Sequence, residues 1–424
     1  MRDLLRNSLM LALLAVCSAG SAETSQDVFT AKREALYQVR VLDKASGDRS
    51  SLGSGFAVSE HIVATNYHVI SSYVTSPERV RVELVDNQQA THNVEIIAVD
   101  VVNDLALLRS SAALPQYLQL ARQEPTQGTV IYALGNPFDL GMSVTQGIYN
   151  GIREHSLPPR IHYSGPVNSG MSGGPSVNAA GEVVGINVAT ANNSVGFLVP
   201  VAQLAALLQQ DWRSAMGKPE FAKLMAAQLL ELQSTYMSQL TRNDWQAEEF
   251  GGALVPGQLA PFVTCWGRSE EPDKTGVTII SRGCSNGQQV QVKNSLTTAF
   301  VEYEFSYLST SVLSQVRLFN FAAARFRGAR PGNRAGSADV SNFECAEDHV
   351  QTGLPELDPG RARVFFCTRA YLKLEGLYDA FFVSFSVDQE DRVLFSHFTL
   401  AGFSRDNTLE FLDRFLRSLR WPSS

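Results

Sequence analysis

Short apolar runs alternate with polar turn residues between about residues 35 and 200. Examples are YQVRVLD at 37–43, LALLRS at 105–110 and TVIYALG at 129–135. Runs of this length, broken by Gly, Asn and Asp, are typical of closely spaced antiparallel strands. No long helical period interrupts them. The pattern therefore predicts an all-β barrel or sandwich over residues 35–200.

The pattern becomes helical after Pro200. Apolar residues at Leu204, Leu207 and Leu208 recur at the spacing of one helix face, and a second helical run follows, broken from the first by Gly and Pro. Its apolar stripe is expected to pack on a core. We therefore predict a helical connector over residues 201–249.

From about residue 250 the chain becomes β-rich again. Apolar strand-like runs include GVTIIS at 276–281, TTAFVEYEFSYL at 297–308 and DRVLFSHFTLA at 391–401. The last segment, 407–419, has the pattern of an amphipathic helix with Asn407 or Thr408 as its N-cap. Residues 250–424 are therefore predicted to form a β-rich α+β domain of unknown function.

The first 22 residues have the pattern of an export signal peptide. Arg2 and Arg6 give a positive start, a short apolar core follows, and small residues precede Glu23. The apolar core is too short to span a bilayer, and we see no other run of about 18 apolar residues. Alternatives are a buried N-terminal helix and a lipid-modified Cys17. The leader predicts an exported, periplasmic or secreted protein without a membrane span.

The net charge and the arrangement of the cysteines argue against nucleic acid as a partner and against a metal site. The net charge of −7 gives no support to a nucleic-acid-binding surface, and the arginine-rich stretch 325–334 is interpreted as a solvated loop. The four cysteines of the mature chain contain no Cys-x-x-Cys pair, and His349 near them is isolated, so we expect two disulfides rather than a metal site. Pairing of nearest neighbours, one of three connectivities, would join Cys265 to Cys284 and Cys345 to Cys367. No cofactor is indicated.

The segment PVNSGMSGGPSV at 166–177 surrounds Ser172 with glycines. A segment rich in Gly, Ser and Pro is also what an ordinary surface loop or turn contains, so it need not be a functional site. Glycine also lets a backbone adopt positive φ and approach a ligand closely, as the amides around a serine nucleophile must. The segment alone leaves both interpretations open.

Earlier in the chain stand a histidine and an aspartate, the two partners that a serine nucleophile needs. His68 follows a predicted strand in ATNYHVI, and Asp104 opens another in VNDLALLR. Singly, His68 is equally consistent with a histidine bonded to backbone, and Asp104 with a turn cap. The order His68, Asp104, Ser172 is that of chymotrypsin-like enzymes and not that of α/β-hydrolases.

Five segments in this order resemble an HtrA-type serine protease. They are GSGFAVSEHIVATNYHVI at 53–70, VNDLALLR at 102–109, ALGNPFDLGMSVTQGIYNGI at 133–152, NSGMSGGPSVNAAGEVVGINVAT at 168–190 and GFLVP at 196–200. The resemblance covers about residues 35–200 and implies a double β-barrel with the active site between the barrels. We find no PDZ-like peptide-binding loop after Pro200.

The resemblance also implies roles for single residues. Ser172 would be the nucleophile, His68 the general base and acid, and Asp104 the orienting carboxylate. The backbone amides of Gly170 and Ser172 would form the oxyanion hole. We expect this machinery to need nothing beyond Pro200.

The predicted pocket for the substrate side chain carries no charge. Pro166 stands where trypsin-like enzymes place the acid that binds basic side chains, and the far wall is predicted to be Ile186, Asn187 and Val188. Such a pocket should prefer small or medium apolar side chains before the scissile bond.

The sequence thus predicts a serine endopeptidase that acts on proteins or peptides. One alternative is a catalytically silent binding or assembly protein on a protease scaffold. The other is a C-terminal recognition module to which the protease is an accessory.

Overall fold

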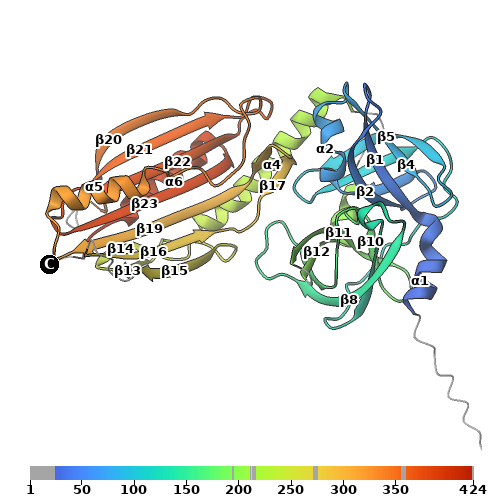
Figure 1. Cartoon of the computed structure of the whole chain (residues 1–424), viewed down its shortest axis with the longest axis horizontal. Helices are drawn as coiled ribbons and strands as arrows, with labels where there is room; N and C mark the ends of the chain where they lie inside the picture. The colour runs from blue at the N-terminus through green and yellow to red at the C-terminus, as the bar shows by residue number, and fades with distance from the viewer. Residues whose placement is uncertain are drawn as a thin grey trace, which may run out of the picture.

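The computed structural model describes residues 24–192, 195–210, 212, 216–270, 276–354 and 360–422. Two β-barrels lie at one end, a large sheet lies at the other, and helix α4 (Lys218–Leu240) runs between them (Figure 1). The predicted leader, 1–22, is outside the described residues. Among those described, no helix is both long and apolar enough to cross a bilayer.

Each barrel is closed by six antiparallel strands, which confirms the predicted double β-barrel. The first barrel has the order β1-β2-β3-β6-β5-β4 and the second β10-β11-β12-β9-β8-β7. Leu107 of β6 and Val199 of β12 belong to one buried apolar cluster, which packs the barrels against each other. The strands are β1 (Leu36–Asp43), β2 (Arg49–Ala57), β3 (Ile62–Thr65), β4 (Val80–Val85), β5 (Thr91–Asp100), β6 (Leu105–Ser110), β7 (Val130–Gly135), β8 (Ser143–Ile152), β9 (Ile161–Ser164), β10 (Pro175–Val177), β11 (Val183–Asn192) and β12 (Val195–Pro200).

Short helices flank the barrels, and α3 follows the last barrel strand at once. These are α1 (Ser25–Lys32), the 3₁₀ helices η1 (Arg33–Ala35) and η2 (Pro137–Asp139), α2 (Tyr67–Thr75) and α3 (Val201–Leu208). The helical stretch predicted after Pro200 is thus present as α3 and α4. The domain boundaries drawn at 200 and 250 stay a prediction.

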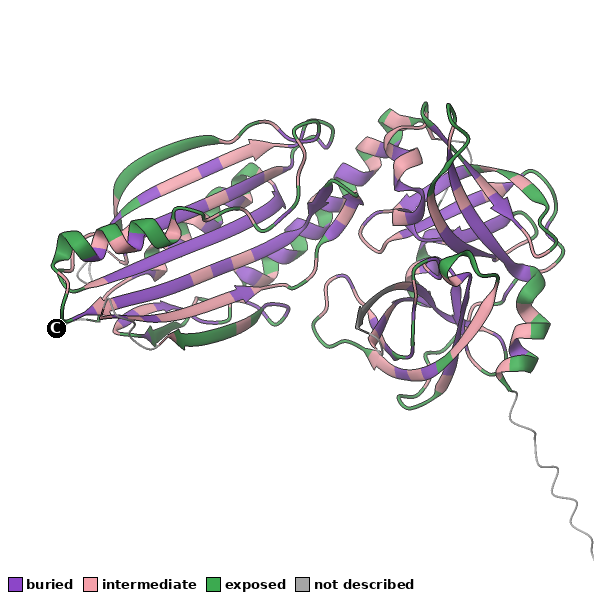
Figure 2. Cartoon of the chain, viewed as in Figure 1, coloured by how far each residue is buried: buried purple, intermediate pink, exposed green. Residues whose placement is uncertain are grey.

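The C-terminal region is built on a seven-stranded antiparallel sheet, in agreement with the predicted β-rich α+β class. Its order is β15-β16-β19-β23-β22-β21-β20, and the central strands are the most buried (Figure 2). The strands are β15 (Thr264–Glu270), β16 (Val277–Ser285), β19 (Phe300–Thr310), β20 (Glu344–Thr352), β21 (Gly360–Ala370), β22 (Tyr378–Ser386) and β23 (Arg392–Phe403). The two-stranded sheets are β13 (Ala247–Phe250) with β14 (Ala253–Pro256), and β17 (Val290–Lys293) with β18 (Leu296–Thr298); the helices are α5 (Gln315–Phe326) and α6 (Arg405–Ser418).

Helix α6 begins earlier than the sequence pattern predicted. Ser404 is its N-cap, and its side chain accepts a hydrogen bond from the backbone N–H of Asn407. Asn407 and Thr408 therefore lie inside the first turn. Phe411 and Phe415 of α6 pack on Phe398 of β23 at ring-centroid distances of 5.1 and 5.2 Å, so the apolar stripe of the helix covers the sheet.

Disulfides tie both edges of the seven-stranded sheet. Cys265 on the edge strand β15 is bonded to Cys284 on β16, and Cys345 on the edge strand β20 is bonded to Cys367 on β21. In each case the two cysteines stand directly opposite each other in the strand register. This is the nearest-neighbour pairing, and it fastens the two strands that have only one hydrogen-bonded neighbour.

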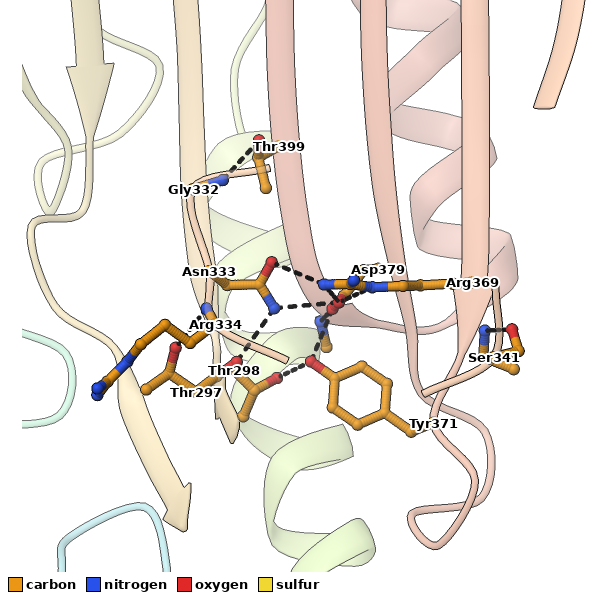
Figure 3. Close-up of polar contacts among 12 residues, drawn as sticks. Thr297, Thr298, Gly332, Asn333, Arg334, Ser341, Arg369, Tyr371, Asp379 and Thr399 are labelled. Carbon is orange, nitrogen blue, oxygen red and sulfur yellow. Dashed lines mark hydrogen bonds and ion pairs between the residues drawn. The ribbon is translucent and has the colours of Figure 1, made fainter. Parts of the chain in front are cut away.

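The stretch 325–334 is not the fully solvated loop that its arginines suggested. Asn333 is 8% exposed and Asp379 is fully buried. The Asn333 amide donates to the Asp379 carboxylate at 3.0 Å, and Arg369 and Tyr371 donate to the same carboxylate at 2.8 and 2.7 Å (Figure 3). A buried carboxylate with several donors is stable where an unpaired one would not be, so this network anchors the loop to the sheet.

The C-terminal region packs directly on the first barrel. Tyr67, which begins α2, is fully buried, and its hydroxyl donates to the carbonyl oxygen of Val292 in β17 at 2.7 Å. The same hydroxyl contacts the sulfur of Met225 in α4 at 3.1 Å. One apolar cluster continues from barrel residues through α4 to the large sheet. Helix α2, which carries His68, is therefore packed against residues beyond Pro200; that the chemistry of the site needs nothing from them stays a prediction.

Candidate active site

His68 and Asp104 are held together by two hydrogen bonds at the start of α2. The Asp104 carboxylate accepts the backbone N–H of His68 at 2.8 Å, and its other oxygen lies 2.7 Å from His68 Nδ1. Asp104 sits in the β5–β6 turn with φ of 64°, and the Asn66 side chain donates to its carbonyl oxygen at 2.8 Å. The Nδ1–H tautomer of His68 is thus favoured, which leaves Nε2 free to accept a proton.

Asp104 also controls the charge of His68. Burial alone would lower the pKa of His68, but the negative charge of Asp104 and the hydrogen bond between them together outweigh burial. The pKa of His68 is therefore raised above its ordinary value. Asp104 therefore stabilises the protonated form of His68.

The glycines around Ser172 are required by close backbone contacts. Gly170 has φ of +94°, and a Cβ there would lie 2.3 Å from the carbonyl oxygen of Asn136. Gly173 has φ of +85°, and a Cβ there would lie 2.3 Å from the carbonyl oxygen of Ser54. A side chain at Gly174 would meet a backbone oxygen at 2.1 Å. The loop can therefore fold behind Ser172 only with glycine at these positions.

Gly173→Ala is expected to destabilise the fold by about 2–5 kcal/mol, because it adds a buried methyl group to a tight contact and an L side chain at positive φ. Gly47→Ala is the matched control, since Gly47 has φ of +76° and no atom within 4 Å of its would-be Cβ. Urea unfolding of both variants would separate the clash from the φ effect. Equal losses in the two variants would contradict the close packing.

Ser54 is a residue whose role the sequence interpretation did not detect. Its hydroxyl donates to the carbonyl oxygen of Gly170 at 2.7 Å and accepts the backbone N–H of Asn136 at 2.9 Å, while its own amide donates to the carbonyl oxygen of Ser172 at 2.8 Å. Ser54 thus links the first barrel to the serine loop. A small polar residue between two glycines on a barrel strand, GSG at 53–55, was the available indication.

The Ser172 hydroxyl donates to the carbonyl oxygen of Val188 at 3.0 Å. Within the described part of the chain it forms no hydrogen bond with His68. Rotation about the Cα–Cβ bond of Ser172 is the smallest movement that would redirect this hydroxyl, because the backbone of the loop is fixed by the contacts above.

The backbone amides of residues 170–173 differ in their hydrogen bonding. The neighbouring amides of Met171 and Gly173 donate to the carbonyl oxygens of Asn168 and Asn187 at 3.0 and 2.9 Å. Among the described residues, no acceptor lies opposite the amides of Gly170 and Ser172. An oxyanion hole needs amides in this state; their assignment to that role stays a prediction.

Comparison with known proteins identifies this part of the chain. Residues 53–186, which contain His68, Asp104 and Ser172, match the family described as trypsin-like peptidase domain. The chain is 35% identical over 245 residues to serine protease HTRA1 of Xenopus tropicalis. It is 38% identical over 163 residues to a probable periplasmic serine endoprotease, DegP-like, of Pseudomonas fluorescens. The chain carries an HtrA-type peptidase domain.

The similarity concerns the peptidase domain and not whole proteins. The match covers 54% of this chain and 51% of the Xenopus protein, and 36% of this chain and 33% of the Pseudomonas protein. The chain therefore spans between a third and about half of the length of these relatives. The crystal structure of the serine endoprotease from Yersinia pestis aligns with a TM-score of 0.39 and 25% identity, over 44% of this chain and 65% of that one.

The predicted side-chain pocket is only partly accessible in the peptidase domain. Ile186 and Asn187 are fully buried, and the Asn187 side chain accepts from Ser176 at 2.7 Å and donates to the carbonyl oxygen of Leu134 at 2.9 Å. Such a side chain braces the barrel and is not available to a substrate. Val188 and Pro166 keep exposed surface, so any pocket wall from the predicted set rests on these two.

The peptidase domain offers no arrangement typical of a metal centre. Within the described residues, no group of three or more His, Cys, Asp or Glu side chains is placed to hold an ion.

Proposed function

We propose that this protein is an exported serine endopeptidase that cleaves proteins or peptides through an acyl-enzyme on Ser172. The observation that carries the proposal is the His68–Asp104 pair, joined by bonds of 2.7 and 2.8 Å beside a serine loop with two available amides. Export is supported by the leader sequence at 1–22 and by the periplasmic location in the printed name of the Pseudomonas relative.

The reaction begins when the Ser172 hydroxyl turns from Val188 to His68. His68 Nε2 takes the proton as Ser172 Oγ attacks the peptide carbonyl, and Asp104 stabilises the imidazolium that forms. The amides of Gly170 and Ser172 bind the oxyanion. His68 then gives the proton to the leaving amine, which leaves an acyl-Ser172 ester. Water activated by His68 hydrolyses this ester and restores the hydroxyl.

A second candidate function is that of a silent binding protein on a protease scaffold. The observation that favours it is the hydrogen bond of 3.0 Å from Ser172 to Val188, which occupies the hydroxyl. Since the His68–Asp104 pair is complete and both predicted oxyanion amides are available, we favour the enzyme.

Acyl-enzyme formation is tested with a p-nitrophenyl ester of an N-blocked apolar amino acid. We expect a fast first release of about one equivalent of p-nitrophenolate per chain, followed by slower turnover, because acylation precedes hydrolysis of the ester on Ser172. Mass spectrometry of acid-quenched samples should show the acyl group. Linear release without an adduct, or a burst that persists in Ser172→Ala, would favour the silent scaffold.

A further inference from the structure

The C-terminal region lines the same cleft as the candidate active site. His68, Asp104 and Val188 form one side of a cavity of about 450 Å³. Residues 287–291, between β16 and the start of β17, form another side, although they are about 115 residues or more from Ser172 in sequence. The loop between β8 and β9 contributes Arg153 and Arg160. The cleft is therefore built by both barrels and the C-terminal region together.

The 287–291 segment is fixed to both barrels. It leads into Val292, whose carbonyl oxygen accepts the Tyr67 hydroxyl of the first barrel at 2.7 Å. On the other side, the Gln288 amide lies beside Leu157 and Arg153; with its nitrogen and oxygen exchanged it would donate to the carbonyl oxygen of Leu157 at 3.2 Å and accept from Arg153 at 3.1 Å. Tyr236 of α4 donates to the same Leu157 oxygen at 2.8 Å. These contacts hold residues 287–291 in place along the cleft.

Two guanidinium groups face this cleft with unused hydrogen-bonding capacity. Arg160 is half-buried and donates to the carbonyl oxygen of Pro159 at 2.9 Å. In the part of the chain that the structure describes, neither Arg160 nor Arg153 has an ion-pair partner within 4.0 Å. The Arg153 guanidinium lies 5.3 Å from the centre of the Phe197 ring. An arginine has five N–H donors in a fork that fits a carboxylate.

Burial and two nearby carboxylates act on Arg160 in opposite directions. Burial lowers the pKa of Arg160, and the charges of Asp104 and Asp100 act in the opposite direction. Asp104 is already engaged by the two bonds to His68, and both oxygens of Asp100 accept bonds from Asn103 at 2.9 and 2.7 Å. A partly desolvated guanidinium without a close ion partner gains more from an anion than an exposed one.

We propose that Arg160, with Arg153 beside it and residues 287–291 as the facing wall, binds the carboxylate of an Asp or Glu side chain in the substrate, at one position near the scissile bond. The proposal rests on the proposed function only in treating the occupant as a peptide substrate. It assigns to the C-terminal region a direct part in substrate choice. It is independent of the pocket for the apolar side chain next to the scissile bond.

Binding to the Ser172→Ala protein tests the acidic subsite without requiring catalysis. The probes are fluorescein-labelled hexapeptides with alanine at all positions except one, which is Glu or its neutral isostere Gln, placed in turn at each position. We expect fluorescence anisotropy to show about a tenfold lower Kd for Glu than for Gln at one position. Equal affinities at every position would overturn the proposal.

Substitutions then assign the preference to Arg160. Arg160→Gln should abolish the difference between Glu and Gln, and Arg160→Lys, which keeps the charge but not the fork, should retain part of it. Arg122→Gln is the matched control, because Arg122 is exposed, belongs to the region of the second barrel and does not line the cleft. An undiminished preference in Arg160→Gln would contradict the assignment.

The salt dependence of binding tests the role of charge without substituting Arg160, and it can be measured even if Arg160→Gln does not fold. In the Ser172→Ala protein the Glu preference should fall when ionic strength rises from about 50 to 500 mM, because the contact is between charges. A preference unaffected by salt would count against Arg160. If no burst of p-nitrophenolate is seen but Glu is still preferred to Gln, the proposed enzyme activity is rejected and the acidic subsite is kept. If the burst is seen but Glu is not preferred, the acidic subsite is rejected and the enzyme activity is kept.

Discussion

Ser172→Ala is expected to lower kcat for peptide hydrolysis by a factor on the order of 10⁶, to the level that the remaining site can support. Removing the nucleophile of a serine protease has an effect of this size, while amides and substrate binding preserve a small residual rate. The side chain of Ser172 makes one hydrogen bond, to Val188, so its loss should leave the fold intact. Hydrolysis of a fluorogenic peptide with an apolar residue before the scissile bond gives the rate.

Ser169→Ala is the matched control for this loss. Ser169 is an exposed serine in the same loop, and its replacement should leave the rate within about twofold of the original, as surface substitutions usually do. Circular dichroism and thermal unfolding of both variants would show whether the fold persists. A Ser172→Ala protein that is folded and keeps full activity would reject Ser172 as the nucleophile.

Asp104→Asn is expected to lower kcat by about 10⁴-fold near neutral pH and to change its pH dependence. The neutral amide no longer favours the Nδ1–H tautomer of His68, and in the best-studied serine proteases this change has an effect of that size. Burial lowers the pKa of His68, but the negative charge of Asp104 and its hydrogen bond to His68 together raise it by more, so the pKa lies above its ordinary value. Activity of the original protein should therefore rise with pH through a midpoint above the ordinary imidazole value.

Without Asp104, burial dominates and the midpoint should move to lower pH. Profiles of kcat/KM between about pH 5 and pH 9 would measure both midpoints. Asp86→Asn is the control, since Asp86 pairs with His92 at 2.9 Å in the same barrel and does not line the cleft that contains His68. An unchanged midpoint in Asp104→Asn, or an equal shift in Asp86→Asn, would contradict the control of the His68 pKa by Asp104.

Features that depend on local backbone geometry were predictable from the sequence. Positive φ at Gly170 and Gly173 requires glycine, and the alternating apolar runs predicted the strands of both barrels. The order His68, Asp104, Ser172 carried more information than any of the three residues alone, because one arrangement of strands brings them together. The His68–Asp104 contact of 2.7 Å is consistent with that prediction.

Contacts between distant segments were not predictable. The bond from Tyr67 to Val292 joins residues 225 positions apart, and no periodicity within either segment indicates it. Asn187 was expected in the pocket wall, whereas its side chain is fully buried and donates to the carbonyl oxygen of Leu134, 53 residues away in sequence. The charge pattern of 325–334 suggested solvent exposure, whereas the burial of Asn333 depends on the carboxylate of Asp379.

The packing of the C-terminal region on α2 changes the expected behaviour of the two halves. The cluster that includes Tyr67, Phe221 and Phe305 continues across both, so loss of the C-terminal region would expose apolar surface of the first barrel. The site is thus described better as the joint product of two barrels and a third region than as a barrel pair with an appended module.

A fluorophosphonate probe shows whether Ser172 is an activated nucleophile, because it reacts with an activated serine and requires no knowledge of the substrate. The labelled protein is digested and the modified residue is located by tandem mass spectrometry. We expect about one adduct per chain, on Ser172, and no labelling in His68→Ala because the base is missing. An unmodified Ser172 in folded protein, or equal labelling of other serines, would contradict this expectation.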